Sequence, residues 1–501
     1  MTPFRSGPHG PRARLGRPAS GRHGEGREKQ KMEPDPRPAL AARLAERLGE
    51  PVDGASLAFF RAAFGVLVAV NVVRWFLLGK IADDLIEPSF HFSYRGFGWV
   101  SPWPGNLPYV FFALVGVLGL CVALGYRYRL TSALLSLGMA QWFLWEKTYY
   151  LNHYYLLALL AFLLAVVPAH RVASLDARSG RTRGGRTVPR WSLLLLRFQV
   201  AVPYVFAGLA KVNPDWLRAE PMRMWLADGR GLPGYFGPLL GLEATAYLLS
   251  YGGLLLDLLM VPALLWRRTR GPAFLVGLVF HALNQLLFQI GVFPLLMIAA
   301  STLFFAPSWP RAFGRRILPR PAEGASRREP AARPGALCLS FLALWAAVQL
   351  FLPLRHLAYP GDVSWTEEGH RFAWRMKLRD KAGAAYLSLT DVATGKTTNL
   401  NPLAYLSRSQ AAEMSTHPDM ILAFAHHVAD LERRRGRDVE IRARVPISLN
   451  GRPYQLLLDP AVDLAAVRDS LRPASWILPL ETPLHATRGQ DWAAPAAAPG
   501  R

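Results

Sequence analysis

The chain has 501 residues, of which 51% are hydrophobic and 19% charged, and its formal net charge is +23. A basic soluble protein would suggest a nucleic-acid partner. Here, however, the long apolar runs lie between residues 56 and 353, and much of the positive charge lies before them or in short segments between them. That pattern is typical of the cytoplasmic loops of a membrane protein and argues against nucleic-acid binding.

The first 50 residues are rich in Arg, Gly and Pro and show no hydrophobic periodicity. This composition predicts a disordered basic tail over residues 1–50. No apolar run precedes residue 56, so we do not expect a cleaved signal peptide.

A helix needs about 20 apolar residues to cross a bilayer. The sequence between residues 51 and 354 predicts a helical domain of about nine such spans. They cover residues 56–79, 108–125, 131–146, 151–168, 192–210, 244–265, 271–289, 292–306 and 336–353. Gly291 and Pro294 interrupt the run that holds the seventh and eighth spans, so one long kinked helix is the alternative there.

The charges of the loops favour nine spans. With the N-terminus inside, the inner loops 126–130, 169–191, 266–270 and 307–335 hold 2, 6, 3 and 7 Lys and Arg residues. The outer loops 80–107, 147–150, 211–243 and 290–291 hold 2, 1, 4 and 0. This bias follows the positive-inside rule and predicts that the C-terminal part lies outside.

The outer loop 80–107 is rich in aromatic residues. Their rings are expected to form an interfacial belt at headgroup depth or part of a lid. They are Phe90, Phe92, Tyr94, Phe97, Trp99 and Trp103.

Residues 355–485 predict a soluble α+β or β-rich domain outside the membrane. Alternating runs at 386–390 and 439–445 indicate strands, and 391–396 indicates a hairpin turn. Residues 418–435 predict a helix, with Pro418 at its start and arginines at its end. Residues 486–501 are rich in Ala and Pro and predict a flexible tail.

Polar groups at or within spans are costly and are functional candidates. Asn152 and His153 lie where the fourth span begins, and Lys211 lies at the outer end of the fifth. His153 is alternatively an interfacial residue, and Lys211 alternatively snorkels to the headgroups. If Lys211 is partly desolvated, its charged form is disfavoured and it becomes a usable base.

The seventh span carries His281, Asn284, Gln285 and Gln289 on roughly one side, which should look into the bundle. Hydrogen bonding between helices is the simpler explanation. We expect Asn152, His153 and Lys211 to share one site near the outer leaflet, with the C-terminal domain as its cover. No P-loop, dinucleotide-binding or zinc-protease motif competes with this site.

Several ordered motifs of the chain resemble the vitamin K-dependent gamma-carboxylases, membrane enzymes that convert protein glutamate to gamma-carboxyglutamate. In the membrane part they are residues 51–61, 146–155, 207–216, 251–257 and 280–288. In the soluble part they are Trp365 with Trp374, and residues 400–402, 445–452, 458–463 and 475–480. The likeness spans about residues 50–485 and implies a bacterial-type homologue with an HTTM-type membrane domain.

The resemblance implies a carbon–carbon lyase with an epoxidase half-reaction. In that family a Lys deprotonates vitamin K hydroquinone, O2 adds, and the strong base so formed removes a glutamate γ-proton before CO2 is captured. Lys211 matches the family's catalytic Lys, and His153 matches the His of the carboxylation half. Asn152, His281, Trp374 and Met376 match residues associated with the quinone. No metal is expected.

Further expectations follow from the resemblance. Arg230, Arg408 and Arg488 are the expected contacts of a glutamate-containing peptide or protein. His370 stands where the animal pattern has an aromatic residue. The Arg- and Ala-rich composition suggests a bacterial inner membrane, with menaquinol as an alternative quinone. Alternative functions are a quinol epoxidase that does not carboxylate peptides, and a membrane transporter or lipid-binding protein.

Overall fold

The computed structural model describes residues 36–182, 185–227, 239, 241–288, 290–313 and 333–484. The chain divides into two units, Met1–Leu44 and Ala45–Arg501. In the first unit, helix α1 begins at Pro36 and runs on to Gly49. The predicted disordered tail therefore does not extend to residue 50. Residues 36–49 are rich in Ala, Leu, Arg and Glu, which are strong helix formers.

Helices occupy each of the nine predicted apolar segments. They are α2 (Ala55–Leu77), α3 (Leu107–Leu124), α4 (Tyr128–Trp145), α5 (Asn152–Val166), α7 (Arg190–Ala210), α11 (Glu243–Leu265), α12 (Arg270–Phe288), α13 (Phe293–Ser301) and α15 (Ala336–Phe351). Short helices join them: η1 (Ala82–Ile86), η2 (Lys147–Tyr149), α6 (Leu175–Arg178), α8 (Pro214–Leu217), α9 (Met222–Ala227), η4 (Thr302–Phe304), α14 (Pro310–Phe313) and η5 (Leu352–Ala358).

Five helices in the described part of the chain are long and apolar enough to cross a membrane. They are Ala55–Leu77, Leu107–Leu124, Arg190–Ala210, Glu243–Leu265 and Ala336–Ala358. Asn152–Val166 and Phe293–Phe304 are apolar but shorter. The structure therefore confirms a multi-span helical membrane protein, while the count of nine spans stays a prediction.

The ends of the helices separate into two groups. At one end, Asp176 accepts hydrogen bonds from the Arg127 and Tyr128 amides, and Ser56 N donates to Pro307 O. All of these residues belong to predicted inner loops or adjoin them. Arg197 of α7 donates to the carbonyls of Leu303, in η4, and of Phe305, which follows η4. The segment that follows α13 therefore lies with the inner loops, as the positive-inside rule predicts.

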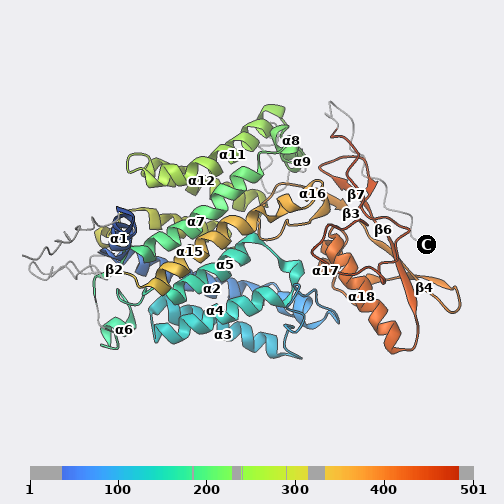
Figure 1. The fold of residues 1–501 in the computed structure, drawn as a ribbon, viewed down its shortest axis with the longest axis horizontal. Helices are drawn as coiled ribbons and strands as arrows, with labels where there is room; N and C mark the ends of the chain where they lie inside the picture. The colour runs from blue at the N-terminus through green and yellow to red at the C-terminus, as the bar shows by residue number, and fades with distance from the viewer. Residues whose placement is uncertain are drawn as a thin grey trace, which may run out of the picture. The chain divides into compact units, whose positions relative to one another are not determined.

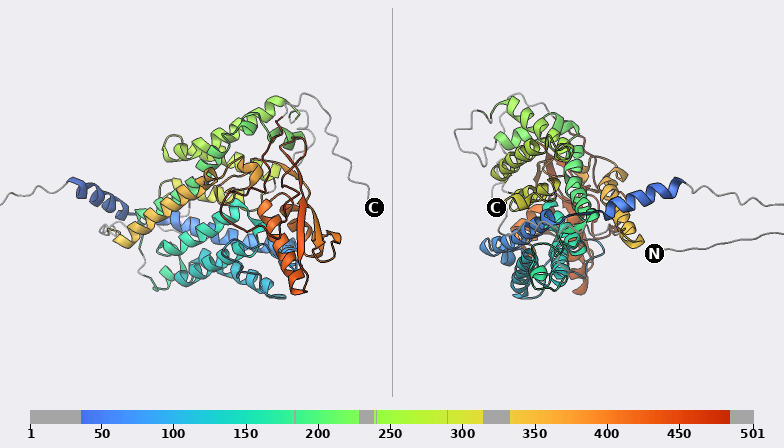
Figure 2. Two further views of the ribbon diagram at one scale, coloured as in Figure 1. Left: turned by 45° about the vertical axis from the view of Figure 1, so that its right-hand side comes forward. Right: turned by 90° about the vertical axis from the view of Figure 1, so that its left-hand side faces the viewer.

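The C-terminal part begins with α16 (Val363–Thr366) and forms two small antiparallel sheets. One has the order β3 (Lys381–Gly383), β7 (Pro446–Leu449), β8 (Gln455–Leu456); the other has the order β5 (Thr397–Leu400), β4 (Tyr386–Asp391), β6 (Val439–Arg444). A further two-stranded sheet, β1 (Pro51–Asp53) with β2 (Thr187–Pro189), lies among the membrane helices' connections. Figure 1 shows the C-terminal elements beyond one end of the long helices, and the left view of Figure 2 shows the same after a turn of 45°.

The predicted strands, hairpin and helix of this domain are confirmed. β4 turns into β5 through Asp391, whose Oδ1 accepts Thr394 N, and Gly395 supplies the positive φ of the turn. Helix α18 (Pro418–Arg434) has Pro418 in its first turn. Helix η6 (Pro402–Ala404) precedes α17 (Arg408–Met414), which begins with a capping box between Ser407 and Gln410.

Part of the aromatic outer loop belongs to the core of this domain. Phe92 is fully buried, and Phe90 contacts Phe424 and His427 of α18. Trp99, by contrast, is 80% exposed. The loop therefore anchors the soluble part with its first aromatic residues and leaves a later one free for an interface.

Candidate active site

Lys211 forms a buried ion pair with Asp257. Lys211 follows the last residue of α7, and its Nζ donates to Asp257 Oδ2 of α11 at 2.6 Å and to Ala207 O at 3.4 Å. Both residues are only 6% exposed. The side chain thus turns back into the bundle, so the structure does not support the alternative that Lys211 snorkels to the headgroups.

Small residues let the two helices approach at this point. A Cβ on Gly208 would lie 2.7 Å from Leu258 Cδ2 and 3.1 Å from Leu258 N. Glycine is therefore needed one turn before Lys211 for the backbone of α11 to come this close. The close approach brings the short Asp257 side chain within reach of the lysine.

The turn after α7 encloses the lysine. Asn213 caps the short helix α8 by accepting Trp216 N on its Oδ1 at 3.0 Å, and Pro214 occupies the first helical position. The Trp216 ring centroid then lies 5.3 Å from Lys211 Nζ, within cation–π range. Its indole N–H donates to Ser250 O of α11 at 2.8 Å. The motif 211–216 is thus a local cap over the pair.

His281 and His153 lie on a chain of contacts that leads from the same helix. Tyr204 is seven residues, or two turns, before Lys211 on α7, and its hydroxyl lies 2.9 Å from His281 Nε2. The Phe293 ring contacts His281 and His153, with centroids 6.1 and 5.9 Å away. His153 is 8% exposed. At a rise of about 1.5 Å per residue, Tyr204 and Lys211 are about 10 Å apart along the helix.

Asn152 connects the membrane helices to the soluble part. Its Oδ1 accepts the Tyr150 hydroxyl at 3.2 Å, and its Nδ2 donates to Arg375 O at 3.3 Å. The ring of the adjacent Trp374 contacts Tyr155 of α5 at 4.9 Å. Trp374 is fully buried, and its indole N–H has no hydrogen-bond partner in the described residues. Met376 is half-buried two residues further on.

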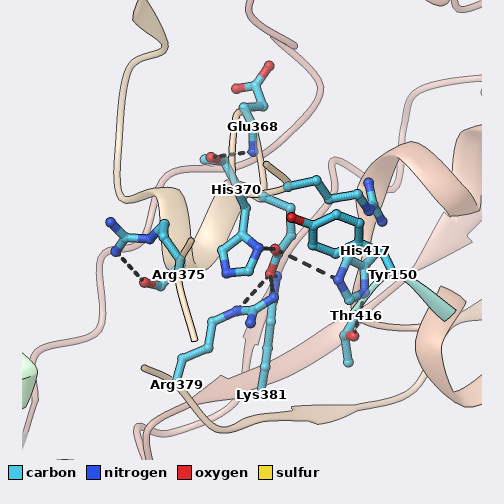
Figure 3. Close-up of polar contacts among 12 residues, drawn as sticks. Tyr150, Glu368, His370, Arg375, Arg379, Lys381, Thr416 and His417 are labelled. Atoms are coloured by element: carbon cyan, nitrogen blue, oxygen red, sulfur yellow. Dashed lines mark hydrogen bonds and ion pairs between the residues drawn. The ribbon is translucent and has the colours of Figure 1, made fainter. Parts of the chain in front are cut away.

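The segment that carries Trp374 has an unusual backbone. Glu367, Phe372, Trp374 and Lys377 all have positive φ angles, between 47° and 64°. Such conformations are costly for residues other than glycine and persist only where the surroundings impose them. The same part of the chain holds a buried cluster of charges, to which His370, Arg379, Lys381 and His417 belong (Figure 3).

Glu367 accepts hydrogen bonds from Arg379 Nε at 2.9 Å and from Lys381 Nζ at 3.2 Å. His370 and His417 lie 3.6 and 3.8 Å from its other oxygen. Burial alone would raise the pKa of Glu367, but Arg379 and Lys381 hold it well below its usual range. Burial lowers the pKa of Lys381 to about 8 and that of His370 well below its usual value.

Two ion-pair groups fix the soluble part against the outer loops. Arg452 binds Asp215 with two hydrogen bonds, of 2.6 and 2.7 Å, and Asn450 Nδ2 donates to the same carboxylate at 2.7 Å. On the other side, Asp419 of α18 accepts Lys147 at 2.9 Å and Arg371 at 2.7 Å. Asn152, His153 and Lys211 therefore all adjoin loops that the soluble part covers.

The structure does not bring every predicted residue into this site. Arg408 is exposed in the first turn of α17, with no ion pair in the described residues. Arg230, Gln289 and Arg488 lie outside the described residues. Asn284 donates to Phe280 O of its own helix. Sequence reasoning assigned no role to Asp257, Tyr204 or Glu367. Asp257 ends the motif 251–257, so an acidic residue inside a predicted span was the available signal.

Comparison with known families agrees with this architecture. The HTTM domain model matches residues 50–309, which is more than half of the chain. The model of the lumenal domain of vitamin K-dependent gamma-carboxylases matches residues 335–483. No solved structure matches the chain.

Fold and site together define an integral membrane protein in which a helical membrane domain carries a lumenal-type domain over a buried lysine. The chain belongs to the vitamin K-dependent gamma-carboxylase family. The resemblance of its motifs to that family is thereby confirmed, and its domains are those of a carboxylase-type enzyme.

Proposed function

We propose that the protein is a vitamin K-dependent gamma-glutamyl carboxylase that couples hydroquinone epoxidation to carboxylation of peptide glutamate. The supporting observation is the buried pair of Lys211 and Asp257 under the soluble part. The proposed location is a bacterial inner membrane, with the soluble part on the extracytoplasmic side. This orientation follows from the basic inner loops.

In this proposal, Lys211 Nζ accepts a proton from a quinol hydroxyl. The lysine must be a neutral amine to do so, although its contact with Asp257 is that of an ammonium and a carboxylate. Two buried charges are costly, and transfer of one proton to Asp257 Oδ2 converts the pair to an amine and a carboxylic acid without net change of charge. Asp257 is therefore the residue we propose as the proton acceptor that frees the amine.

The residues beside Asn152 fit a planar aromatic ligand. The buried Trp374 N–H lacks a partner in the described residues, and the Tyr155 ring contacts both the Trp374 ring and the Phe372 ring. An acceptor oxygen on a quinol ring would satisfy that N–H. Such a bound quinol supplies, on reaction with O2, the strong base that the glutamate γ-proton requires. We propose that Asn152 and Trp374 orient it, with Met376 and His281 at its edges.

The proposal assigns His153 to the carboxylation half and the basic residues Arg230, Arg408 and Arg488 to the acidic peptide. The peptide, together with CO2, would reach the site from the side that the soluble part covers. A water-excluded site favours such chemistry because a strong base would otherwise be quenched. The burial of Lys211 and His153 supports this condition.

The test uses the purified full chain in lipid nanodiscs. It receives vitamin K hydroquinone or menaquinol, labelled bicarbonate and a glutamate-containing peptide. Epoxide together with labelled peptide is the expected result. Epoxide without label would overturn the carboxylase and leave a quinol epoxidase. Formation of neither product would overturn both activities and favour the transporter or lipid-binding alternative.

Two variants test the assignment of the base. General-base catalysis contributes about 10²- to 10⁴-fold, so K211M should reduce epoxide formation by that factor. D257N misplaces the amine and removes its proton acceptor, with an expected loss of about 10²-fold. The exposed Lys396 on the β4–β5 turn provides the matched control K396M, which should retain full activity. Full epoxide formation by K211M would show that Lys211 is not the base.

A further inference from the structure

Arg74 is a cation within a membrane helix, and no counter-charge pairs with it among the described residues. It lies in the last turn of α2, and its guanidinium makes no hydrogen bond or ion pair with the residues that the structure describes. The neighbouring Val73 and Leu77 are 55% and 81% exposed and face outward. Arg74 is half-buried on the other side, with Asn71 and Trp75, which are both 1% exposed. An unpaired ionisable group on an inward face is a candidate binding site.

Contacts place the Arg74 guanidinium beside the histidine pair. A Cβ on Gly291 would lie 2.7 Å from Arg74 Nη1, so the guanidinium rests on the turn between α12 and α13. Phe293, two residues later, contacts the rings of both His153 and His281.

A hydrogen bond fixes α2 against α5 at this height. Trp75 Nε1 donates to the Tyr154 hydroxyl at 2.7 Å. These two residues are the chain neighbours of Arg74 and His153. Their bond therefore holds the guanidinium level with the first turn of α5.

Two further observations indicate groups that could bind a ligand here. The side-chain amide of the buried Asn71 faces the Tyr154 hydroxyl, and neither of its polar atoms makes a hydrogen bond of ordinary geometry in the described residues. Helix α5 begins at Asn152 with no side-chain cap; the Tyr154 and Tyr155 amides donate to Leu151 O, which leaves the amides of Asn152 and His153 without a partner in the described residues. A helix N-terminus carries a partial positive charge and binds anions. Unpaired polar groups this deeply buried are rare without a partner.

We propose that Arg74, Asn71 and the N-terminus of α5 bind a carboxylate, namely the side-chain carboxylate of the glutamate that is modified. A guanidinium binds a carboxylate with two parallel hydrogen bonds, and the amide and helix terminus add donors. The identity of this carboxylate rests on the proposed function. Bicarbonate is a second ligand with the same carboxylate group. Only a glutamate side chain, however, is attached to a peptide backbone that can orient it toward His153.

The test is equilibrium binding of two labelled peptides to the full chain in nanodiscs, without quinol. One peptide carries a single glutamate, and the other has glutamine in its place. The unchanged protein should bind the glutamate peptide more tightly. R74Q should weaken that binding about 10- to 100-fold, the worth of charge-assisted hydrogen bonds, and leave binding of the glutamine peptide unchanged. R74K should retain an intermediate affinity because it keeps the charge.

The exposed Arg268, between α11 and α12, provides the control R268Q, which removes the same charge elsewhere. It should bind both peptides as the unchanged protein does. Equal binding of the glutamate peptide by R74Q would overturn the proposal, as would equal binding of both peptides by the unchanged protein. A higher bicarbonate requirement in R74Q with unchanged peptide binding would assign the site to bicarbonate and also overturn it. Absence of epoxide formation in a separate assay counts against the proposed function alone, because these binding measurements need no turnover.

Discussion

Glu367 is buried among Arg379, Lys381, His370 and His417, in the same part of the chain as Trp374. The carboxylate stays ionised because the two cations lower its pKa by more than burial raises it. The histidines stay neutral because burial, and for His370 also Arg379, lowers their pKa values. The cluster therefore holds its charge pattern only while the domain is folded.

This charge pattern predicts that acid opens the domain. Glu367 has a depressed pKa, so its contribution to stability is present above about pH 4.5 and is lost as pH falls. His370 and His417 are protonated below about pH 6.5 in the unfolded chain but not in the folded one, so stability also falls below that pH. Each proton that the unfolded chain binds and the folded domain does not lowers the free energy of opening by about 1.4 kcal/mol for every unit by which the pH falls.

Hydrogen exchange of the amides of α18 and β6 between pH 7 and pH 5 measures this slope after correction for the intrinsic exchange rate. H370F keeps an aromatic ring at the position and removes one of the two imidazoles, so its slope should be about half that of the unchanged protein. H426Q removes an imidazole outside the cluster and should keep the full slope. Equal slopes in H370F and the unchanged protein would contradict the assignment.

Individual residues were predictable where they break an apolar pattern. Lys211, Asn152 and His153 stand at the ends of apolar runs, and the structure places Asn152, and Asp215 four residues after Lys211, in contact with the soluble part. Asp257 lies within such a run too, but one sequence does not show which face of α11 meets α7. The Glu367 cluster was not predictable, because its members are up to 50 residues apart and meet only through the tertiary fold.

The geometry of the candidate site depends on the packing of helices α7 and α11 against each other. Their contact at Gly208 is closer than any side chain allows, and the Lys211–Asp257 pair follows one turn later. A helix pair packed at such a distance cannot absorb an added methyl group without moving. The position of Lys211, the proposed base, is therefore set by backbone packing and not by the lysine side chain alone.

G208A is the direct test of this dependence. The added methyl group must push α11 away, which should lower the free energy of unfolding by about 1–3 kcal/mol. It should also increase the distance between Lys211 and Asp257. Epoxide formation should fall, measured together with the thermal midpoint. Gly252 on the same helix α11 has open space around its Cβ position, so G252A should instead stabilise the helix by about 0.5–1 kcal/mol at full activity. Unchanged activity in G208A would show that the spacing is not critical.

At the level of elements, hydrophobicity predicted where the helices lie but not their lengths. Each predicted span contains a helix, and β4, β6 and α18 lie where alternation and Pro418 place them. Helix α13 with η4 is the main departure. Its 12 residues from Phe293 to Phe304 rise about 18 Å, less than a hydrocarbon core of about 30 Å. Pro294 in its first turn and the extended Phe305 after η4 bound it.

The whole molecule is organised by the separation of its loops. The three long or aromatic outer segments all contact the soluble part: Ser89 N donates to Tyr405 O, Lys147 pairs with Asp419, and Asp215 pairs with Arg452. The loop charges predicted this sidedness, because the bias acts on every connection at once. The pairings themselves were not predictable, since they join motifs that lie far apart in the sequence.

Among these contacts, the salt bridge between Asp215 and Arg452 should contribute most to the attachment of the soluble part to the membrane helices. Both side chains are largely buried, and Asp215 belongs to the same short motif as Lys211. R452Q leaves the carboxylate buried without its cation, a change that costs about 3–5 kcal/mol. The exposed pair of Arg95 and Asp469 is the comparison, because R95Q should cost at most about 1 kcal/mol.

Hydrogen exchange of residues 445–458 and of the outer loop 211–227 reports the opening. Both segments should exchange faster in R452Q, while the inner loops 126–130 and 169–182 keep their protection. Because the membrane helices remain assembled, epoxide formation without peptide should fall less than peptide carboxylation does. An equal fall of both activities, or protection equal to that of R95Q, would mean that the soluble part does not dock through this bridge. Selective loss of carboxylation would instead show that the docked domain holds the peptide over a membrane site that is otherwise complete.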